Sequence, residues 1–402
     1  MNITLKDFQV DYVAELRDQL QYVRDLGPRR PAAALLNAPT GAGKTVMATA
    51  LIEELLHGSE TQIGDPAITF LWLTDQPELN KQTHDKMLAT SSELLKQHLI
   101  IVDAGLDQER LDAGRVYFLN TQKLGSGTSF VKTGDKRDWS VWQTIQNTIS
   151  ADPQRFVLIV DEAHRGTRGK EAEEAESILQ RFLIGSRGEL EPVPVVIGIS
   201  ATPERFVDLC SRTKRPLFQV NVEPERVRAS GLIKDYVDLF HPDQKRPADV
   251  TMLVEAVADW TRYQADWAAF ETSEGELTPE PVLVVQVEDA RSATKELSRT
   301  DLASVVGTLA RELGIAATEG WIAHAFQDES DFTIAGHTVR YLAPSAIDAD
   351  PSVKVVLFKT SLNSGWDCPR AEVMVSFRTA RDETNIAQLV GRMVRAPLAR
   401  RI

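Results

Sequence analysis

Apolar side chains along the first half of the chain follow two different spacings, and together these predict alternating helices and strands. In residues 4–26 they recur at the spacing of one helix face, at Leu5, Phe8, Tyr12, Val13, Leu16, Leu20 and Val23. Unbroken apolar runs, typical of parallel strands covered on both faces, occupy residues 33–36, 68–73, 99–102, 116–119, 156–160 and 195–199. Helical segments separate these runs, so the pattern predicts an α/β fold with a parallel sheet.

A second α/β pattern follows a less regular stretch. Residues 217–222 and 236–240 alternate like exposed strands. Further strands are expected at residues 282–287, 353–358 and 372–377. Helices are expected at residues 250–270, at 290–313 with an interruption near Thr300, and at 385–394. We therefore expect two domains, residues 1–225 and 226–402, with the boundary in the irregular stretch.

Composition narrows the class of protein. Apolar residues make up 43% and charged residues 26% of the chain, as in ordinary soluble domains. The two cysteines, Cys210 and Cys368, lie far apart in the sequence, which argues against a disulfide scaffold and suits the cytoplasm. The N-terminal residues lack the pattern of a signal peptide, and no apolar run approaches the 18 residues of a membrane span. A cytoplasmic protein without a membrane partner is predicted.

The net charge of −13, taken alone, argues against a nucleic-acid binder, because phosphate contacts need Lys and Arg. Net charge does not exclude a locally basic surface, however. The charges are unevenly distributed: residues 171–176 are acidic and residues 378–401 are rich in Arg.

Residues 38–45 carry the clearest chemistry, with the sequence Ala-Pro-Thr-Gly-Ala-Gly-Lys-Thr between a predicted strand and a predicted helix. Such a turn points successive backbone N–H groups at a phosphate, and the helix N-terminus adds positive charge. The loop residues expected to do this are Thr40, Gly41, Ala42 and Gly43. Lys44 can reach the β- and γ-phosphates and Thr45 can ligate Mg²⁺. The usual pattern begins with Gly, where this chain has Ala38.

Polar residues follow several of the predicted strands, where ligands of parallel sheets gather. They are Thr74, Thr121 and Gln122, the group Asp161, Glu162 and His164, and the pair Ser200 and Thr202. A carboxylate at such a strand end can hold Mg²⁺, and a second one can activate water. For Thr74 and Thr121, capping of the strand end is an equally good interpretation.

In the second half, Gln388, Arg392 and Arg395 are spaced i, i+4 and i+7 and so share one helix face. A solvated basic helix is one interpretation. Arg is also the side chain suited to bidentate phosphate contacts and to fingers inserted into a nucleotide site.

Taken together, these stretches resemble the superfamily-two helicases, which are DEAD/DEAH-box-like nucleic-acid-dependent ATPases. The resemblance runs in order through residues 8–9, 38–45, 71–82, 119–124, 161–164, 200–203, 284–288, 359–369 and 388–395. The amino-acid sequences of residues 365–370 and 388–395 are most similar to those of the motor (Res) subunits of type III restriction enzymes. Gln286 departs from the pattern, since many relatives carry a hydroxyl there.

The resemblance implies two tandem RecA-like domains, each a mainly parallel sheet flanked by helices, with ATP in the cleft between them. It implies that Gln9, which the local pattern alone would leave solvated, contacts adenine. Lys44, Asp161, Glu162, Gln388, Arg392 and Arg395 would be catalytic, with Thr45 and Asp161 on Mg²⁺. Gly365 and Asp367 would contact nucleotide, and His164, Ser200 and Thr202 would couple its state to movement. Thr74, Thr121, Gln122 and Thr360 would lie along the nucleic acid.

The expected function is therefore a DNA translocase or helicase, the motor of a restriction or other bacterial defence system. An RNA helicase, a nucleotide-binding regulatory scaffold and a small-molecule kinase are alternatives. The chain ends seven residues after Arg395, and no metal-dependent nuclease pattern follows residue 204. We expect a truncated or stand-alone motor without cleavage activity of its own, which a modification or specificity subunit or a nuclease partner would complete.

Overall fold

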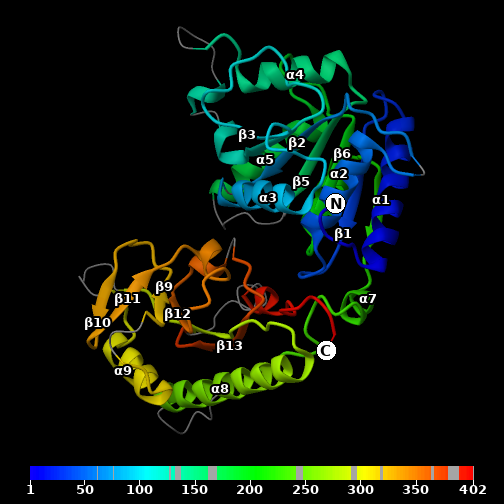
Figure 1. Ribbon diagram of the computed structural model, residues 1–402. Coiled ribbons are helices and arrows are strands. Elements are labelled where there is room, and N and C mark those ends of the chain that lie inside the picture. Colours follow the sequence, from blue (N-terminus) through cyan, green and yellow to red (C-terminus); the bar gives the residue numbers. More distant parts are fainter. Residues whose placement is uncertain are drawn as a thin grey trace. The chain divides into compact units, whose positions relative to one another are not determined.

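The computed structural model describes residues 1–60, 62–75, 77–125, 128–131, 137–161, 170–240, 248–290, 297–316, 320–363, 366–378 and 389–401. The chain divides into two compact units, Met1–Ser230 and Gly231–Ile402. Each unit has its own sheet and its own buried core (Figure 1). Within these described ranges no helix combines the length and the apolar character that a membrane crossing needs.

The first unit is built on a seven-stranded sheet in the order β3-β4-β2-β5-β6-β1-β7, in which every neighbouring pair is parallel. The strands are β1 (Ala32–Asn37), β2 (Thr69–Thr74), β3 (Leu99–Ile101), β4 (Val116–Asn120), β5 (Phe156–Asp161), β6 (Val195–Ser200) and β7 (Leu217–Asn221). The central strands are buried on both faces, which explains their unbroken apolar sequences.

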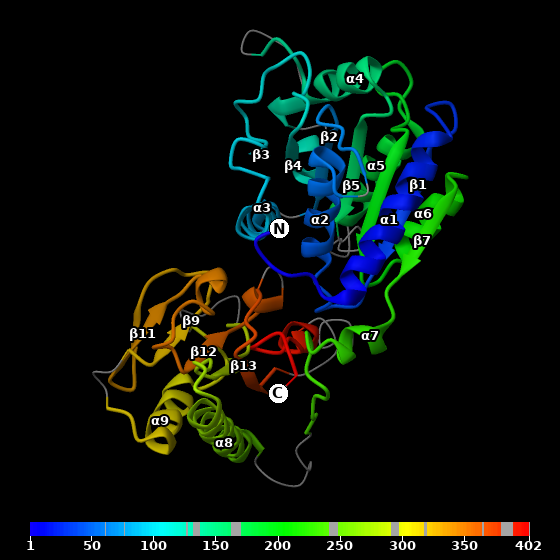
Figure 2. The same cartoon turned by 45° about the vertical axis from the view of Figure 1, so that its right-hand side comes forward.

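Helices cover both faces of this sheet (Figure 2). One layer holds α1 (Asp7–Asp25), α2 (Lys44–His57) and α3 (Pro77–Thr90). The other layer holds α4 (Val141–Ala151), α5 (Lys170–Ile184) and α6 (Glu204–Arg212), whose Ile145, Phe182 and Leu209 share a core with the sheet. Two 3-10 turns, η1 (Thr121–Leu124) and η2 (Ser129–Val131), and the short helix α7 (Pro224–Ala229) complete the unit.

The second unit has a six-stranded sheet in the order β10-β11-β9-β12-β8-β13. Its strands are β8 (Val282–Gln286), β9 (Ile322–His324), β10 (Phe332–Ile334), β11 (His337–Tyr341), β12 (Val355–Phe358) and β13 (Ala371–Ser376). Among the strands that the structure describes here, only β10 runs antiparallel to its neighbour.

Alternate residues of β8 face two different cores, as expected for a strand. Leu283 and Val285 pack with α8 (Ala248–Glu274) and α9 (Leu302–Leu313). Val282 and Val284 pack instead with Trp366, together with Leu389 and Met393 from the C-terminal part of the chain. Two more 3-10 turns, η3 (Pro344–Ala346) and η4 (Ser361–Asn363), link the strands.

These observations confirm the predicted fold class of two mainly parallel sheets flanked by helices. The strand predicted at residues 236–240 is wrong: the segment is not a strand, and Tyr236 and Phe240 are 76% and 81% exposed. The helix predicted over residues 290–313 is confirmed for α9, and the interruption predicted near Thr300 matches the non-helical residues 297–301; residues 291–296 lie outside the described part. Strands β9, β10 and β11 were not predicted.

Candidate nucleotide site

The loop between β1 and α2 has the backbone that a phosphate-binding turn requires. Gly41 and Gly43 have φ of +87° and +80°, in the left-handed region that glycine adopts at little cost. Ala38 lies outside that region, is fully buried, and donates its N–H to the Ser200 carbonyl at 3.0 Å. The first position of the pattern therefore does not need glycine here, and Ala38 fills it without backbone strain.

Gln9 on α1 contacts this loop through its side chain. Its side chain is only 4% exposed, so the solvated interpretation of the sequence is wrong. Gln9 Nε2 donates to the Ala42 carbonyl at 3.0 Å, and Gln9 Oε1 accepts from the Lys6 N–H at 3.0 Å. A Cβ on Gly43 would lie 2.5 Å from Gln9 Nε2. The amide thus ties the start of α1 to the loop at its tightest point.

Two other predicted residues of this unit, Asp161 and Ser200, lie at the same edge of the sheet, because the carboxyl ends of parallel strands meet there. Ser200 ends β6 in register with Asn37 of β1, and Asp161 ends β5 in register with Ile199 of β6. Ser200 Oγ accepts the Thr202 N–H at 3.0 Å and so shapes the turn that follows. The structure therefore brings Ser200 onto the strand beside β1 and Asp161 onto the next strand along.

The side chains that would hold phosphate and metal begin α2. Lys44 is its first residue, and Lys44 Nζ contacts the Ala38 carbonyl at 3.4 Å, which places the amine over the loop. The Thr45 hydroxyl and the Asp161 carboxylate are hard oxygen donors, the kind that Mg²⁺ prefers. In the described ranges no group of three or more His, Cys, Asp or Glu gathers to hold a metal.

The predicted nucleic-acid contacts of the first unit differ in exposure. Thr74 is 2% exposed and its hydroxyl donates to Asn80 Oδ1 at 2.8 Å. Thr121 is 7% exposed at the start of η1, which Asn120 caps by accepting the Lys123 N–H at 3.1 Å. Gln122 is exposed. Strand-end capping thus accounts for the Thr74 hydroxyl in this structure.

In the second unit, the two predicted arginines are attached to the segment that follows η4. Arg395 Nη1 pairs with Asp367 Oδ2 at 2.5 Å, and Arg392 Nη1 donates to the Trp366 carbonyl at 2.6 Å. Arg392 lies in the helical stretch 389–393, and Arg395 follows it. A freely solvated basic helix does not describe these contacts. Thr360 follows β12 and is exposed, whereas Glu162, His164, Gly365 and Gln388 lie outside the described residues.

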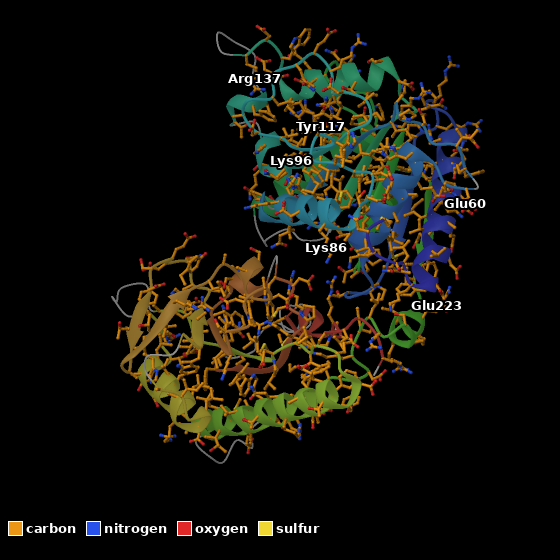
Figure 3. All side chains as sticks on the ribbon, in the orientation of Figure 1. Glu60, Lys86, Lys96, Tyr117, Arg137 and Glu223 are labelled. Atoms are coloured by element: carbon orange, nitrogen blue, oxygen red, sulfur yellow. The ribbon has the colours of Figure 1, made fainter. Side chains whose placement is uncertain are left out.

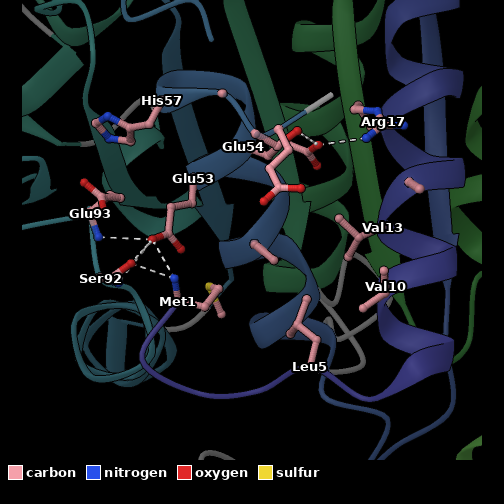
Figure 4. Close-up of a pocket in the computed structure, with 15 residues that line it drawn as sticks. Met1, Leu5, Val10, Val13, Arg17, Glu53, Glu54, His57, Ser92 and Glu93 are labelled. Atoms are coloured by element: carbon pink, nitrogen blue, oxygen red, sulfur yellow. Dashed lines mark hydrogen bonds and ion pairs between the residues drawn. The ribbon is translucent and has the colours of Figure 1, made fainter. Parts of the chain in front are cut away.

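A hollow of about 640 Å³ lies elsewhere in the first unit, along α1 and α2 (Figure 4). Four of its lining side chains are carboxylates, namely Glu53, Glu54, Glu60 and Glu93. Glu53 Oε1 accepts from the Met1 amine at 3.0 Å, and Arg17 pairs with Glu54 at 2.8 Å. So many carboxylates repel a triphosphate, and none of the predicted nucleotide residues lines this hollow.

Two buried arginines were not identified from the sequence. Arg215 donates to the carbonyls of Leu183 and Val193 at 2.7 and 2.8 Å, and burial lowers its pKa to about 10. Arg370 donates to the carbonyls of Ile347 and Asp350, both at 2.6 Å, and burial lowers its pKa as well. Arg215 and Arg370 hold loops at the amino ends of their sheets, away from the strand ends that carry the candidate site.

Comparisons with known proteins agree with this geometry. Residues 2–205 match the family described as "Type III restriction enzyme, res subunit". A structure of an S. cerevisiae Dbp5 variant bound to a Gle1 variant and IP6 is 13% identical, with 97% of this chain and 84% of that chain covered and a TM-score of 0.50. S. cerevisiae Dbp5 bound to RNA and ADP BeF3 is 12% identical, with 96% and 84% covered and a TM-score of 0.49.

At such low identity, the likeness to the Dbp5 variant concerns the fold alone. It confirms the prediction of two tandem RecA-like sheets. No functionally curated protein matches the sequence significantly.

Proposed function

The chain belongs to the family of the type III restriction enzyme res subunit, and from this premise we propose that it is a nucleic-acid-dependent ATPase that moves along DNA or unwinds it. It is a helicase-like ATPase domain by family and fold. More specifically, we propose that it is the motor part of a restriction or other bacterial defence system. This assignment rests on the amino-acid sequences of residues 365–370 and 388–395 together with the family match.

One observation carries the proposal. The left-handed Gly41 and Gly43, the Lys44 that opens α2, and the strand ends of Asp161 and Ser200 meet at one edge of a parallel sheet. Backbone N–H groups, a lysine and a carboxylate in this arrangement suit the phosphates of a nucleoside triphosphate. The proposed cofactors are ATP and Mg²⁺, with Thr45 and Asp161 as the metal ligands.

In the proposed mechanism, each residue mainly positions groups or stabilises charge, because phosphoryl transfer needs little else from a protein. Lys44 and the loop N–H groups hold the phosphates, and Gln9 orders the loop and contacts adenine. Bound Mg²⁺ would neutralise charge on the β- and γ-phosphates. Glu162 accepts a proton from the attacking water.

The second unit would complete the site. Asp367 and Gly365 contact nucleotide, and Arg392 and Arg395, supported by Gln388, stabilise the charge that develops on the γ-phosphate. Arg395 must then exchange its ion pair with Asp367 for phosphate. Because groups from both units are needed, hydrolysis would require a closed cleft, and His164, Ser200 and Thr202 would couple nucleotide state to closure.

DNA would lie along Thr74, Thr121, Gln122 and Thr360. The exposed Gln122 and Thr360 can contact it through their side chains, whereas the buried Thr74 and Thr121 fit contacts through backbone atoms. Contacts of this kind reach phosphate and sugar, so the motor should tolerate any sequence. Specificity and cleavage would then come from a modification or specificity subunit or a nuclease partner.

The test is the rate of ATP hydrolysis by the full chain, alone and with single-stranded DNA, duplex DNA or RNA, with Lys44→Ala as the inactive control. DNA should raise the wild-type rate and leave the control near zero. No stimulation by any nucleic acid would favour the regulatory scaffold or the small-molecule kinase. Stimulation by RNA alone would favour the RNA helicase.

A further inference from the structure

The helix that ends the first unit is fastened to the helix that carries Gln9. Arg226 of α7 pairs with Asp11 of α1 at 2.6 Å, and its guanidinium lies 5.2 Å from the centre of the Tyr12 ring. The N–H of Glu223, labelled in Figure 3, donates to the Tyr12 hydroxyl at 3.3 Å. Asp11 and Tyr12 lie within one turn of Gln9. The chain therefore leaves the first unit from a point fixed close to the phosphate loop.

The first residues of the second unit are fastened to the segment that carries Arg395. The Lys234 N–H donates to the Val394 carbonyl at 2.7 Å, and the Ala396 N–H donates to the Leu232 carbonyl at 3.0 Å. Ile233 stands opposite Arg395 in this short antiparallel pairing. Residues 232–234 thus fix the backbone from which the Arg395 side chain projects.

The Lys234 side chain anchors this pairing to the sheet. Its Nζ lies 2.9 Å from Glu372 Oε2 and 3.0 Å from the Ala371 carbonyl, at the start of β13. The Glu372 side chain is 9% exposed and also accepts from Trp267 Nε1 of α8 at 3.3 Å. This half-buried ion pair with its additional hydrogen bonds holds one geometry, because loss of either partner leaves the other partner's charge uncompensated.

Gly231, directly before this pairing, is a position where the backbone requires glycine. Its φ is +77°, and a Cβ there would lie 2.2 Å from the Arg401 backbone nitrogen and 2.5 Å from the Arg400 carbonyl carbon. Both the backbone conformation and the close approach exclude any side chain. Only residues 227–231 separate the α7 anchor at Arg226 from the pairing at Leu232, a span of at most about 22 Å even if fully extended.

We propose that residues 231–234 are a positioning segment for Arg395, which holds the backbone of the arginine against the sheet of the second unit. Lys234 is its central positioning residue. The inference rests on the proposed function, because it gives Arg395 a role at the phosphates. It adds that the contacts of residues 231–234 set where Arg395 stands within the second unit, so loosening these contacts should slow hydrolysis while ATP still binds.

The first experiment compares Lys234→Met with Lys234→Arg and with Arg262→Met, a control that removes an exposed positive charge from α8 of the same unit. Lys234→Met should lower the DNA-stimulated kcat about fivefold and leave ATP affinity within about twofold. Lys234→Arg should restore most of the rate, and Arg262→Met should match the wild type. Equal rates for Lys234→Met and wild type would overturn the proposal.

The second experiment combines Lys234→Met with Arg395→Ala. If Lys234 acts through Arg395, the double variant should be no slower than Arg395→Ala alone; losses that multiply would overturn the proposal. Hydrogen exchange of the backbone amides at positions 234 and 396 should be faster in Lys234→Met than in the wild type, and faster still in Gly231→Ala. Unchanged exchange rates in both variants would also contradict the proposal. An Arg395→Ala chain with full turnover would instead contradict the proposed role of Arg395.

Discussion

Gly43 meets two demands that no other residue can satisfy together. Its φ of +80° strains any residue with a Cβ, and that Cβ would lie 2.5 Å from Gln9 Nε2. Gly43→Ala should therefore displace Gln9 or distort the loop. The left-handed conformation alone costs about 1–2 kcal/mol, so ATP binding should weaken about tenfold or more, as measured by titration calorimetry.

Gly307 offers the matched control, since it lies inside α9 and a Cβ there would come no closer than 4.0 Å to another atom. Gly307→Ala should bind ATP as the wild type does and gain about 0.5–1 kcal/mol of stability. Wild-type ATP affinity in Gly43→Ala would show that the loop does not hold phosphate.

Glu162 is proposed to take the proton of the attacking water. Glu162→Gln keeps the size of the side chain but removes its basicity, so ATP should still bind while turnover falls about 10²- to 10⁴-fold. Paired measurements of ATP affinity and single-turnover hydrolysis check this. A fully active Glu162→Gln enzyme would refute the role.

For individual residues, the sequence predicted which positions carry the candidate chemistry, but not which of their side chains are buried or what they contact. The positions of Gly41, Gly43 and Lys44 followed from local spacing, and the structure gives them the expected backbone. The burial of Gln9 could not be predicted locally, because its partner Ala42 lies 33 residues away. Likewise, only the packed sheet shows that the Thr74 hydroxyl is already bonded to Asn80.

Among the elements, β9 and the loop that follows it depend on one buried histidine. His324 is fully buried, its Nε2 lies 3.0 Å from the Ser330 carbonyl, and its Nδ1 accepts the Phe326 N–H at 3.2 Å. These contacts need the neutral ring with its proton on Nε2. Burial lowers the pKa of His324 below its usual 6.5, although Asp331 and Asp328 oppose that shift.

This lowered pKa gives stability a definite pH dependence. Below about pH 6.5 His324 binds a proton more readily in the unfolded chain than in the folded chain. The free energy of unfolding therefore falls as pH falls. His324→Gln should remove part of this slope between pH 7 and 5. Urea unfolding of both full chains across that range checks it, and equal slopes would contradict the assignment.

The missed elements have physical explanations. β9 and β10 are each three residues long, too short for a recognisable pattern. The turn between β10 and β11 places Ala335 at φ +49° and Gly336 at φ +81°, a hairpin turn that the weak Ala-Gly signal did not reveal. Residues 236–240 have strand-like alternation but pair with no strand in the part of the chain that the structure describes, and alternation alone does not make a sheet.

For the whole molecule, a net charge of −13 means that the proposed DNA substrate would have to be held by local basic groups against a repulsive background. Contacts between such groups and phosphate release counterions, so raising salt should weaken DNA stimulation of ATP hydrolysis steeply. From 50 to 200 mM salt, the DNA concentration for half-maximal stimulation should rise about tenfold or more. A flat response would mean that phosphate contacts are minor.

The sequence predicted the architecture at this scale because apolar strands separated by helices admit few folds. The family match and the likeness of fold support that prediction independently. The fastening of residues 232–234 to the Arg395 segment could not be predicted, since it joins stretches about 160 residues apart through backbone atoms that carry no sequence signal.

The central claim is that groups from both units act on one nucleotide, and Arg395→Ala tests it most directly. Hydrolysis by this variant is measured at saturating DNA, and ATP affinity is measured on the same protein. We predict a rate about 10³-fold below wild type, with affinity changed only a few fold. Wild-type turnover, or a loss explained entirely by failure to bind ATP, would contradict the account.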